Sequence, residues 1–258
     1  MVLRFKSLGS GSTGNATVIE AGHENPVRLL VDCGFGLKHL LARLEVAGLR
    51  PSQIDAIFIT HEHGDHIGCV AALALRYQLP VWMSSGTYSA IGAPDLGGML
   101  RIARDSETIE IGAMAVSPFT VPHDAREPLQ LTCSSGTAKI GILTDLGHAT
   151  DHVLMHLQAC SALLLECNHD SALLAGSTYP EFLKHRVGGQ YGHLSNEHAA
   201  QIARAVGHSG LKTIVAAHLS LTNNTPALAR ECLRKAVACT GSEVVLADAV
   251  SGCDWVAA

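Results

Sequence analysis

The sequence predicts an α/β fold in which two β-sheets pack face to face and helices cover their outer sides. The chain has 258 residues, of which 47% are hydrophobic, so it can bury a substantial core. Short apolar runs typical of strands come in two batches, and segments with helical periodicity lie between and after them. The chain contains no low-complexity tract, linker or internal sequence repeat, so we expect one domain over residues 1–258.

The first batch of predicted strands fills the N-terminal third of the chain. A Gly/Ser-rich turn at 9–14 separates its first two members. Helices are predicted over Leu37–Ala47 and Ile67–Tyr77, and Pro80 ends the second of them before the next strand. The predicted strands of this batch are Leu3–Ser7, Ala16–Glu20, Arg28–Asp32, Ala56–Thr60 and Val81–Met83.

The second batch begins near residue 108 and is followed by alternating strands and helices. Its predicted strands are Thr108–Ile111, Ala113–Thr120, Leu129–Cys133, Lys139–Thr144, Ala162–Glu166, Thr213–Ala217 and Glu243–Ala247. Its predicted helices are Asp151–Gln158, Asn196–Val206 and Pro226–Ala238.

Composition restricts the class of partner. The net charge of −5 argues against a generally basic nucleic-acid-binding surface, although metal ions can supply positive charge inside a cleft. The N-terminus lacks the order of a signal peptide, and no apolar run is long enough to span a membrane. We therefore expect a cytoplasmic protein without a membrane partner. The eight cysteines are scattered without a CxxC pair, which favours reduced, mostly buried thiols.

The strongest functional signal is the segment IFITHEHGDH at residues 57–66. An apolar strand ends in three histidines and two acids within six positions, and a polar surface turn has no need for that order. Alternate side chains at a strand end point the same way, so His61 and His63 can hold one metal while Asp65 and His66 reach a neighbouring one. Imidazoles and a carboxylate are the donors expected for Zn²⁺, and Mn²⁺ or Fe is also compatible.

The run T-H-E-H-G-D-H matches the H-x-H-x-D-H signature of the metallo-β-lactamase superfamily, which the chain resembles over most of its length. The resemblance implies a four-layer αββα sandwich and further ligands on loops after later strands. His123 after Phe119–Pro122, Asp145 after Ile140–Thr144 and His218 after Ile214–Ala217 occupy those places in the family's order.

The resemblance implies a centre of two divalent metal ions. It assigns His61, His63 and His123 to the first ion, Asp65, His66 and His218 to the second, and Asp145 to both. It also places Asp32 beneath the ligands, where it orients them without binding a metal. The alternative for Asp32 is an ordinary carboxylate at a strand end.

The block Gly192–Asn196, about 25 residues before the last expected ligand, is similar to the phosphodiesterase branch of the superfamily that includes tRNase Z. In that branch the histidine corresponding to His193 binds no metal. It reaches the scissile phosphate and stabilises charge or protonates the leaving group. The alternative is a structural residue at a helix start beside Ser195, which suits an N-cap.

Four segments together resemble the YycJ/WalJ-like group of bacterial metallo-hydrolases. They are Ser10–Asn15, Leu165–Asp170, Gly192–Asn196 and His218–Asn224. The resemblance implies a phosphodiesterase acting on DNA, with 5′-to-3′ exonuclease activity. The group has E-S-N-H-D where this chain has E-C-N-H-D at 166–170, and the long insertion with which tRNase Z grips tRNA has no counterpart here.

The same segments supply the expected substrate-binding residues, which are Ser12, Asn15, Asn168, His169 and Ser195. The loop at 9–15 can offer backbone N–H groups and side chains to a phosphate, or it is a plain hairpin turn. Asn168 and His169 face the cleft, or they form a turn held by side-chain hydrogen bonds. Glu166 is a further candidate, as a partner that orients His193.

The expected mechanism is attack of metal-activated hydroxide on phosphorus, with Asp65 also able to accept the proton and His193 stabilising developing charge. The metal core alone also suits a thioester or lactone hydrolase of the glyoxalase type, or a small-molecule cyclic phosphodiesterase. The His193 block and Asn168-His169 argue against thioester or lactone hydrolysis. A secreted β-lactamase is disfavoured by the missing export signal, and a non-enzymatic metal-binding scaffold by the full residue set.

Overall fold

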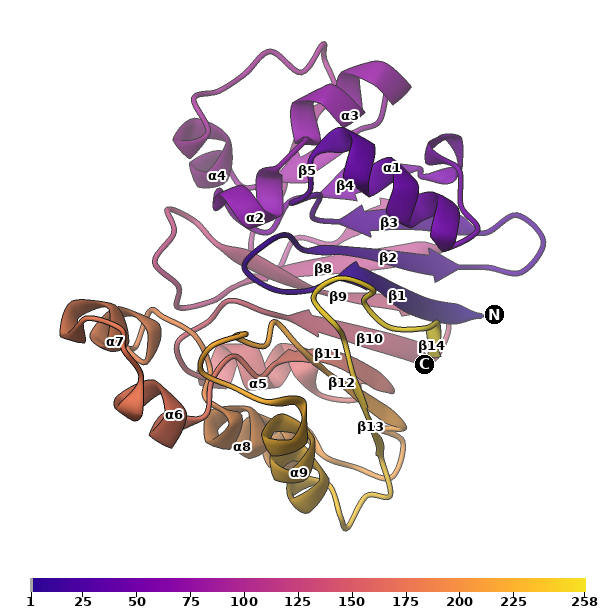
Figure 1. Cartoon of the computed structure of the whole chain (residues 1–258). Coiled ribbons are helices and arrows are strands. Elements are labelled where there is room, and N and C mark those ends of the chain that lie inside the picture. The colour runs from indigo at the N-terminus through magenta and orange to yellow at the C-terminus, as the bar shows by residue number, and fades with distance from the viewer. Residues whose placement is uncertain (1) are drawn as a thin grey trace.

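Two seven-stranded β-sheets form the centre of the protein in a computed structural model that describes residues 2–258 (Figure 1). In spatial order, the first sheet contains β14 (Val256–Ala257), β1 (Leu3–Gly9), β2 (Ala16–Ala21), β3 (Val27–Val31), β4 (Ala56–Phe58), β5 (Val81–Met83) and β6 (Leu100–Ile102). The second contains β13 (Glu243–Leu246), β12 (Thr213–Ala217), β11 (Ala162–Glu166), β10 (Ala138–Leu143), β9 (Leu129–Ser135), β8 (Met114–Thr120) and β7 (Ile109–Ile111).

The two sheets share one pairing pattern. In the first, β14, β1, β2 and β3 pair antiparallel and β3, β4, β5 and β6 pair parallel. In the second, β7 to β10 pair antiparallel and β10 to β13 pair parallel. Parallel neighbours require crossover connections, and helices in these connections cover the sheets. The carboxyl ends of the parallel strands in each sheet therefore lie at one edge.

The helices lie on the outer face of each sheet (Figure 1). On the first sheet they are α1 (Leu37–Val46), α2 (Gly64–Ile67), α3 (Val70–Tyr77) and α4 (Ser85–Ala90), with a 3₁₀ turn at Pro51–Gln53. The second half of the chain contributes α5 (Asp151–Leu157), α6 (Ser171–Gly176), α7 (Glu181–Val187), α8 (Asn196–Val206) and α9 (Pro226–Ala236). None of the helices within residues 2–258 is long and apolar enough to span a membrane.

Three buried apolar layers hold these elements together. Side chains such as Phe5 and Phe58 fill the space between the two sheets. Leu40 and Leu73 belong to the layer between the first sheet and its helices, and Ile202 to the layer beneath α8 and α9. The order helix, sheet, sheet, helix is the four-layer αββα sandwich, so the predicted fold class is confirmed.

The central parallel strands explain why the sequence signal was clear there. Every residue of β11 is buried, as are all residues of β12 except Thr213. A strand covered on both faces becomes a nearly continuous apolar run, as in ALLLE and TIVAA. Such runs end abruptly where the chain leaves the core, and polar residues then follow at the sheet edge.

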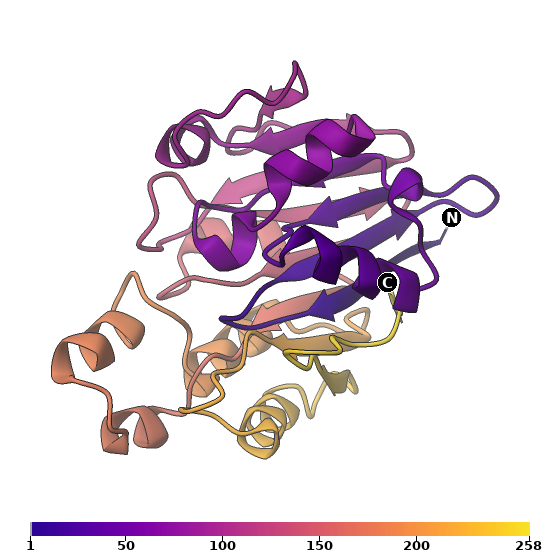
Figure 2. The same cartoon turned by 45° about the horizontal axis from the view of Figure 1, so that its top comes forward.

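The helix expected over Ile67–Tyr77 was wrong as a single element. The chain forms two helices, with a break at Gly68 and Cys69, because the backbone N–H of Cys69 donates to the carbonyl oxygen of Cys33 at 3.1 Å. The sequence analysis also missed several short elements, which are the 3₁₀ turn, α4, β6, α6, α7 and β14. Of these, α6 and α7 with their flanking loops form an arm, residues 170–192, that projects beyond the edge of the sandwich (Figures 1 and 2).

Candidate metal centre

The candidate site lies where parallel strands of both sheets end. Asp32 follows β3 and His61 follows β4 in the first sheet. In the second sheet Asp145 follows β10, Glu166 is the last residue of β11, and His218 follows β12. The crevice outside the carboxyl ends of parallel strands is the usual ligand site of open α/β sheets. Residues far apart in the sequence therefore converge here.

His61, His63 and His123 form a first group. Nε2 of His61 lies 3.1 Å from Nδ1 of His63, and Nε2 of His123 lies 3.3 Å from that same atom. Nδ1 of His123 is held by the carbonyl oxygen of Gly192 at 3.1 Å, which turns its Nε2 into the group. Ligands at 2.0–2.1 Å around tetrahedral Zn²⁺ stand about 3.3 Å apart, so the three nitrogens suit one shared cation.

Two histidines of this group, His61 and His123, favour the neutral, metal-binding form. Burial, together with the nearby charge of His66, lowers the pKa of His61 well below its usual value. Burial likewise lowers the pKa of His123. A neutral imidazole keeps the lone pair that a metal ion needs.

Asp65, His66, Asp145 and His218 form a second group. Asp145 Oδ2 lies 3.2 Å from Nε2 of His66, and its Oδ1 lies 3.2 Å from Nδ1 of His218. Asp65 Oδ2 lies 3.6 Å from Nε2 of His66 and 3.7 Å from Nε2 of His218. Ligand atoms of Asp145, His61 and His66 also lie within 4.8 Å of one another. The Asp145 carboxylate therefore stands between the two groups.

The second group contains two carboxylates that are paired with its histidines, whereas the first group contains histidines alone. Burial would lower the pKa of His218, but the charge of Asp145 and the nearby carboxylates of Asp65 and Glu166 raise it to about 10. Burial would raise the pKa of Asp145, but the charges of His218 and His66 hold it well below its usual value. A divalent cation bound here would displace protons from these histidines.

Two atoms test whether a metal ion fits the second group. Nε2 of His218 and Oδ2 of Asp145 are buried, and neither has a hydrogen-bond partner among residues 2–258. Glu166 Oε1 lies 3.1 Å from Nδ1 of His218, and a carboxylate only accepts, so Nδ1 carries a proton. A cation that displaces the other proton would therefore find the lone pair on Nε2. Buried polar atoms are rarely left without a partner. The orphaned atoms and the donor set fit a metal ion.

Asp32 lies beneath the cluster, as expected from the sequence. Its Oδ2 accepts from Nδ1 of His66 at 2.8 Å, which leaves Nε2 of that ring for the second group. Its Oδ1 accepts from the backbone N–H of Thr60 at 2.9 Å. The Thr60 hydroxyl in turn lies 3.0 Å from Nδ1 of His61. One carboxylate thus fixes rings of both groups.

Three of the converging residues have left-handed backbones. The φ angles are 60° at Asp32, 56° at Asp145 and 55° at His218. For a residue other than glycine such strain costs about 1–3 kcal/mol and is held by surrounding contacts. In each case the residue lies just beyond a strand, where the chain turns away from the sheet. These turns position the three side chains in the site.

His193 faces the same centre and is paired with Glu166. Nδ1 of His193 lies 2.8 Å from Glu166 Oε1, and 3.5 Å from Asp145 Oδ1. Burial would lower the pKa of His193, but the charge and hydrogen bond of Glu166 raise it. Glu166 was only a candidate partner from the sequence. In the structure it is fully buried and touches both His193 and His218.

Of the five expected substrate-binding residues, only Ser12 has its side chain at the cavity over the cluster. Asn15 is buried, and its amide nitrogen lies 3.3 Å from Asp65 Oδ2 and 3.1 Å from a ring nitrogen of His66. That side chain therefore supports the second group.

The other three lie behind the cluster and are buried. The amide of Asn168 donates to the carbonyl oxygen of His218 at 3.0 Å, and the Ser195 hydroxyl caps α8 through the N–H of His198. His169 pairs with Ser195 through an isolated β-bridge. These contacts favour the structural alternatives weighed for Asn168 and Ser195, and we retain Ser12 alone as a substrate contact.

A cavity of about 410 Å³ opens over both groups, and the arm covers one side of it. Its lining residues are Ser12, His63, Gly64, Asp65, Asp124, Asp145, Leu183, Arg186, Val187, Gly192, His193 and His218. Arg186 Nε donates to Asp124 Oδ2 at 2.7 Å, which places a cation at the rim. The sequence analysis missed both residues. Asp124 had the signal of following His123 directly, whereas Arg186 lies on a helix without a motif.

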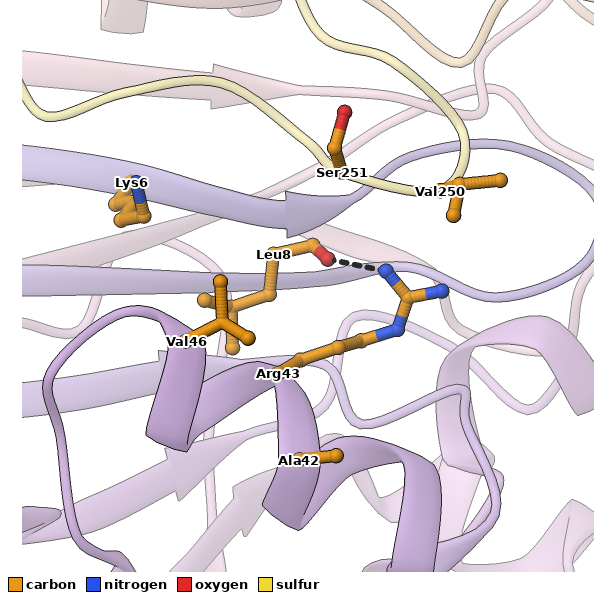
Figure 3. Close-up of a pocket in the computed structure, with 7 residues that line it drawn as sticks. All are labelled: Lys6, Leu8, Ala42, Arg43, Val46, Val250 and Ser251. Carbon is orange, nitrogen blue, oxygen red and sulfur yellow. Dashed lines mark hydrogen bonds between the residues drawn. The ribbon is translucent and has the colours of Figure 1, made fainter.

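A second cavity, of about 330 Å³, lies between α1 and the loop after Asp248 (Figure 3). Its lining contains no histidine, carboxylate or cysteine. Among the residues drawn, the one hydrogen bond runs from the Arg43 guanidinium to the carbonyl oxygen of Leu8 at 2.7 Å (Figure 3). This cavity offers no group for hydrolysis, so the chemistry belongs to the first one.

Known proteins resemble this chain in sequence and in fold. The beta-lactamase superfamily domain matches residues 27–218. The exodeoxyribonuclease YycJ of Bacillus anthracis is 34% identical over 89% of this chain and 87% of its own, and WalJ of Streptococcus pneumoniae is 32% identical over 88% and 85%. The metallo-β-lactamase-fold protein YhfI of Bacillus subtilis covers all of both chains with a TM-score of 0.79 at 16% identity, a likeness of fold alone.

Proposed function

This chain belongs to the metallo-β-lactamase superfamily and to its YycJ/WalJ-like group of metal-dependent hydrolases, and from that membership we propose that it is a dinuclear-metal phosphodiesterase that degrades DNA from an end. The observation that carries the proposal is His193, held by Glu166 at the cavity over the metal-binding cluster. The relatives named exodeoxyribonuclease support DNA as the polymer.

We assign His61, His63 and His123 to one ion and Asp65, His66 and His218 to the other, with Asp145 shared. Two Zn²⁺ or Mn²⁺ ions, with Fe also compatible, would activate water and neutralise charge on the phosphate when bound. The lowered pKa values of His61 and His123, and the carboxylates of Asp65 and Asp145, suit such a pair. This assignment is the one that the sequence motif predicts.

Asp65 is the proposed acceptor of the proton from the attacking water. Burial would raise its pKa, but the nearby rings of His218 and His66 lower it, so the carboxylate is ionised at neutral pH. It lines the cavity and lies within 4 Å of ring nitrogens of His66 and His218. A fixed carboxylate in this position is within reach of a water held over the cluster.

His193 is the proposed donor to the leaving oxygen. Its Nδ1–H donates to Glu166, so Nε2 is the nitrogen available to the cavity. The raised pKa keeps the ring protonated to a higher pH than a free histidine. An alkoxide leaving group such as a nucleotide 3′-oxygen needs a proton, and general acid catalysis of this kind contributes about 10²–10⁴-fold.

The proposed function is tested by comparing polymers, the ends of those polymers and a thioester as substrates. Purified protein with Zn²⁺ or Mn²⁺ is assayed on end-labelled DNA and RNA carrying 5′-phosphate or 5′-hydroxyl, and on a glutathione thioester. We expect stepwise release of nucleotides from DNA. Turnover of the thioester without any phosphodiester cleavage would replace the proposal with the glyoxalase-type alternative.

The role of His193 is tested with His193→Ala, which we expect to retain its metals. The loss of kcat is expected to be large on DNA and much smaller on an ester with a p-nitrophenolate leaving group, because p-nitrophenolate departs without a proton. His39→Ala, an exposed histidine on α1, is the matched control. Equal losses on both substrates would exclude leaving-group protonation by His193.

A further inference from the structure

Phe182 and Tyr191 are the exposed aromatic side chains within residues 2–258, with exposed fractions of 74% and 60%. Both belong to the arm, within ten positions of each other. The other phenylalanines, tyrosines and tryptophans that the structure describes are buried or half-buried. Exposed rings are unfavourable in water, so their concentration on one projecting element calls for a ligand.

Phe182 and Tyr191 are each next in sequence to a residue that lines the cavity over the metal-binding cluster. Phe182 and Arg186 stand four positions apart on α7 and share a face of that helix. Arg186 lines the cavity together with Leu183 and Val187. Tyr191 directly precedes Gly192, which is also part of the lining. The two exposed rings therefore lie on the part of the arm that contributes Leu183, Arg186, Val187 and Gly192 to the cavity wall.

The C-terminal part of the arm is fixed to the body of the protein. The N–H of Asp124 donates to the carbonyl oxygen of Tyr191 at 2.9 Å, and the N–H of His193 donates to that of Val187 at 2.8 Å. The Arg186–Asp124 ion pair adds a third attachment. A platform held in this way loses little freedom when a ligand binds.

The negative net charge of the chain bears on how a nucleic acid can be held. With a net charge of −5, the chain as a whole does not attract the phosphates of a nucleic acid electrostatically. On α7 the ammonium of Lys184 is already engaged with Glu181 and the carbonyl oxygen of Ala175. Every nucleobase has a π-face, and stacking on aromatic side chains is a general way to bind single strands.

We propose that Phe182 and Tyr191 form a stacking platform for unpaired bases of a DNA strand whose scissile phosphate lies over the metal-binding cluster. Arg186, which pairs with Asp124 through Nε but stays 62% exposed, contacts a neighbouring phosphate. The inference rests on the proposed nuclease function and specifies its substrate. Bases within a duplex are paired and stacked on each other, so a blunt end must fray before it can use the platform. The platform is therefore open to single-stranded or frayed ends.

The test measures kcat and KM on a 5′-labelled single-stranded oligonucleotide for Phe182→Ala, Tyr191→Ala and the conservative Phe182→Trp. We expect each alanine to raise KM about tenfold, equivalent to about 1.4 kcal/mol and within the range for one stacked base. Tryptophan is expected to restore binding, and Phe182→Leu to fail because it keeps apolar area without a ring. Val46→Ala, an exposed apolar residue on α1, is the matched control.

A second substrate with abasic sites near the scissile end separates stacking from general damage to the arm. If the rings stack on bases, the alanine variants change KM for the intact strand but add little on the abasic strand. Equal effects on both strands would overturn the inference. If wild-type protein cleaves no DNA, the proposed function fails instead, so the two failures are distinguishable.

A second copy of this chain is the alternative partner for the exposed rings, and light scattering tests whether it binds there. We expect wild type and Phe182→Ala to show the same mass in solution. A dimer that dissociates in the variant, with unchanged KM for DNA, would make the rings an interface between copies and overturn the platform.

Discussion

Glu166→Gln probes the connection between the proposed acid and the second metal group. Glu166 Oε1 accepts from Nδ1 of His193 at 2.8 Å and from Nδ1 of His218 at 3.1 Å. Its Oε2 accepts from the backbone N–H groups of Leu194 and Leu146 at 3.1 and 3.2 Å. The side chain is fully buried, so its two oxygens depend on these four donors and not on water.

A glutamine cannot satisfy these four donors in either orientation. With its NH₂ at the place of Oε2, it opposes two buried N–H groups, and each unsatisfied group costs about 1–3 kcal/mol, or about 2–6 kcal/mol together. With its NH₂ at the place of Oε1, it requires lone pairs on Nδ1 of both rings. His218 then carries its proton on Nε2 and loses the lone pair proposed for the metal.

Two measurements distinguish the two orientations of the glutamine. Denaturant unfolding of the metal-free protein gives the free energy of unfolding, and elemental analysis after dialysis gives the metal content. We expect a loss of at least about 2 kcal/mol, or of one metal ion, together with a lower kcat. Glu20→Gln is the control, since Glu20 is equally buried but pairs only with Arg4 and Arg28, so metal content should stay normal. A stable, fully metallated and active Glu166→Gln would refute the assignment.

Three further predictions follow from the same geometry. Because the charges of Glu166 and Asp145 raise the pKa of His193, its acid form is present below that pKa and lost above it, so kcat for DNA should fall on the alkaline side in a pH profile. Gly34→Ala should cost about 1–3 kcal/mol and deplete metal, because its Cβ would collide with the carbonyl oxygen of Asp65, whereas Gly36→Ala meets nothing and is the control in unfolding and metal assays. Chelation should abolish hydrolysis, and readdition of metal at 100 times its dissociation constant should raise the free energy of unfolding by about 2.7 kcal/mol per site, measured by denaturant titration.

The site could be predicted from the sequence where a buried apolar strand is followed directly by polar, metal-binding residues. The strands that carry the site are apolar runs that end in His61, Asp145 and His218, and these run ends were visible without coordinates. The order of the motifs along the chain then assigned the candidate ligands to two groups. The structure brings the members of each group together, and their roles as metal ligands remain predictions.

Other features leave no pattern in a single sequence. Short edge strands such as β6 and β14 depend on their neighbours for pairing, and α7 exposes most of its surface, so none has a strong hydrophobic period. Arg186 and Phe182 were missed for that reason. Ser195 shows that a motif can also suggest too much. It was predicted as a substrate contact because it lies beside His193, but its hydroxyl caps α8.

The block Gly192-His193-Leu194 shows what coordinates add to a motif. The sequence marked it for one catalytic histidine. In the structure the carbonyl oxygen of Gly192 orients His123 of the first group, and the N–H of Leu194 donates to Glu166, which also holds His218 of the second. A side chain on Gly192 would collide with the backbone oxygens of α7. Three consecutive residues therefore connect both metal-binding groups, the proposed acid and the arm. A substitution at any of them should displace side chains in both groups.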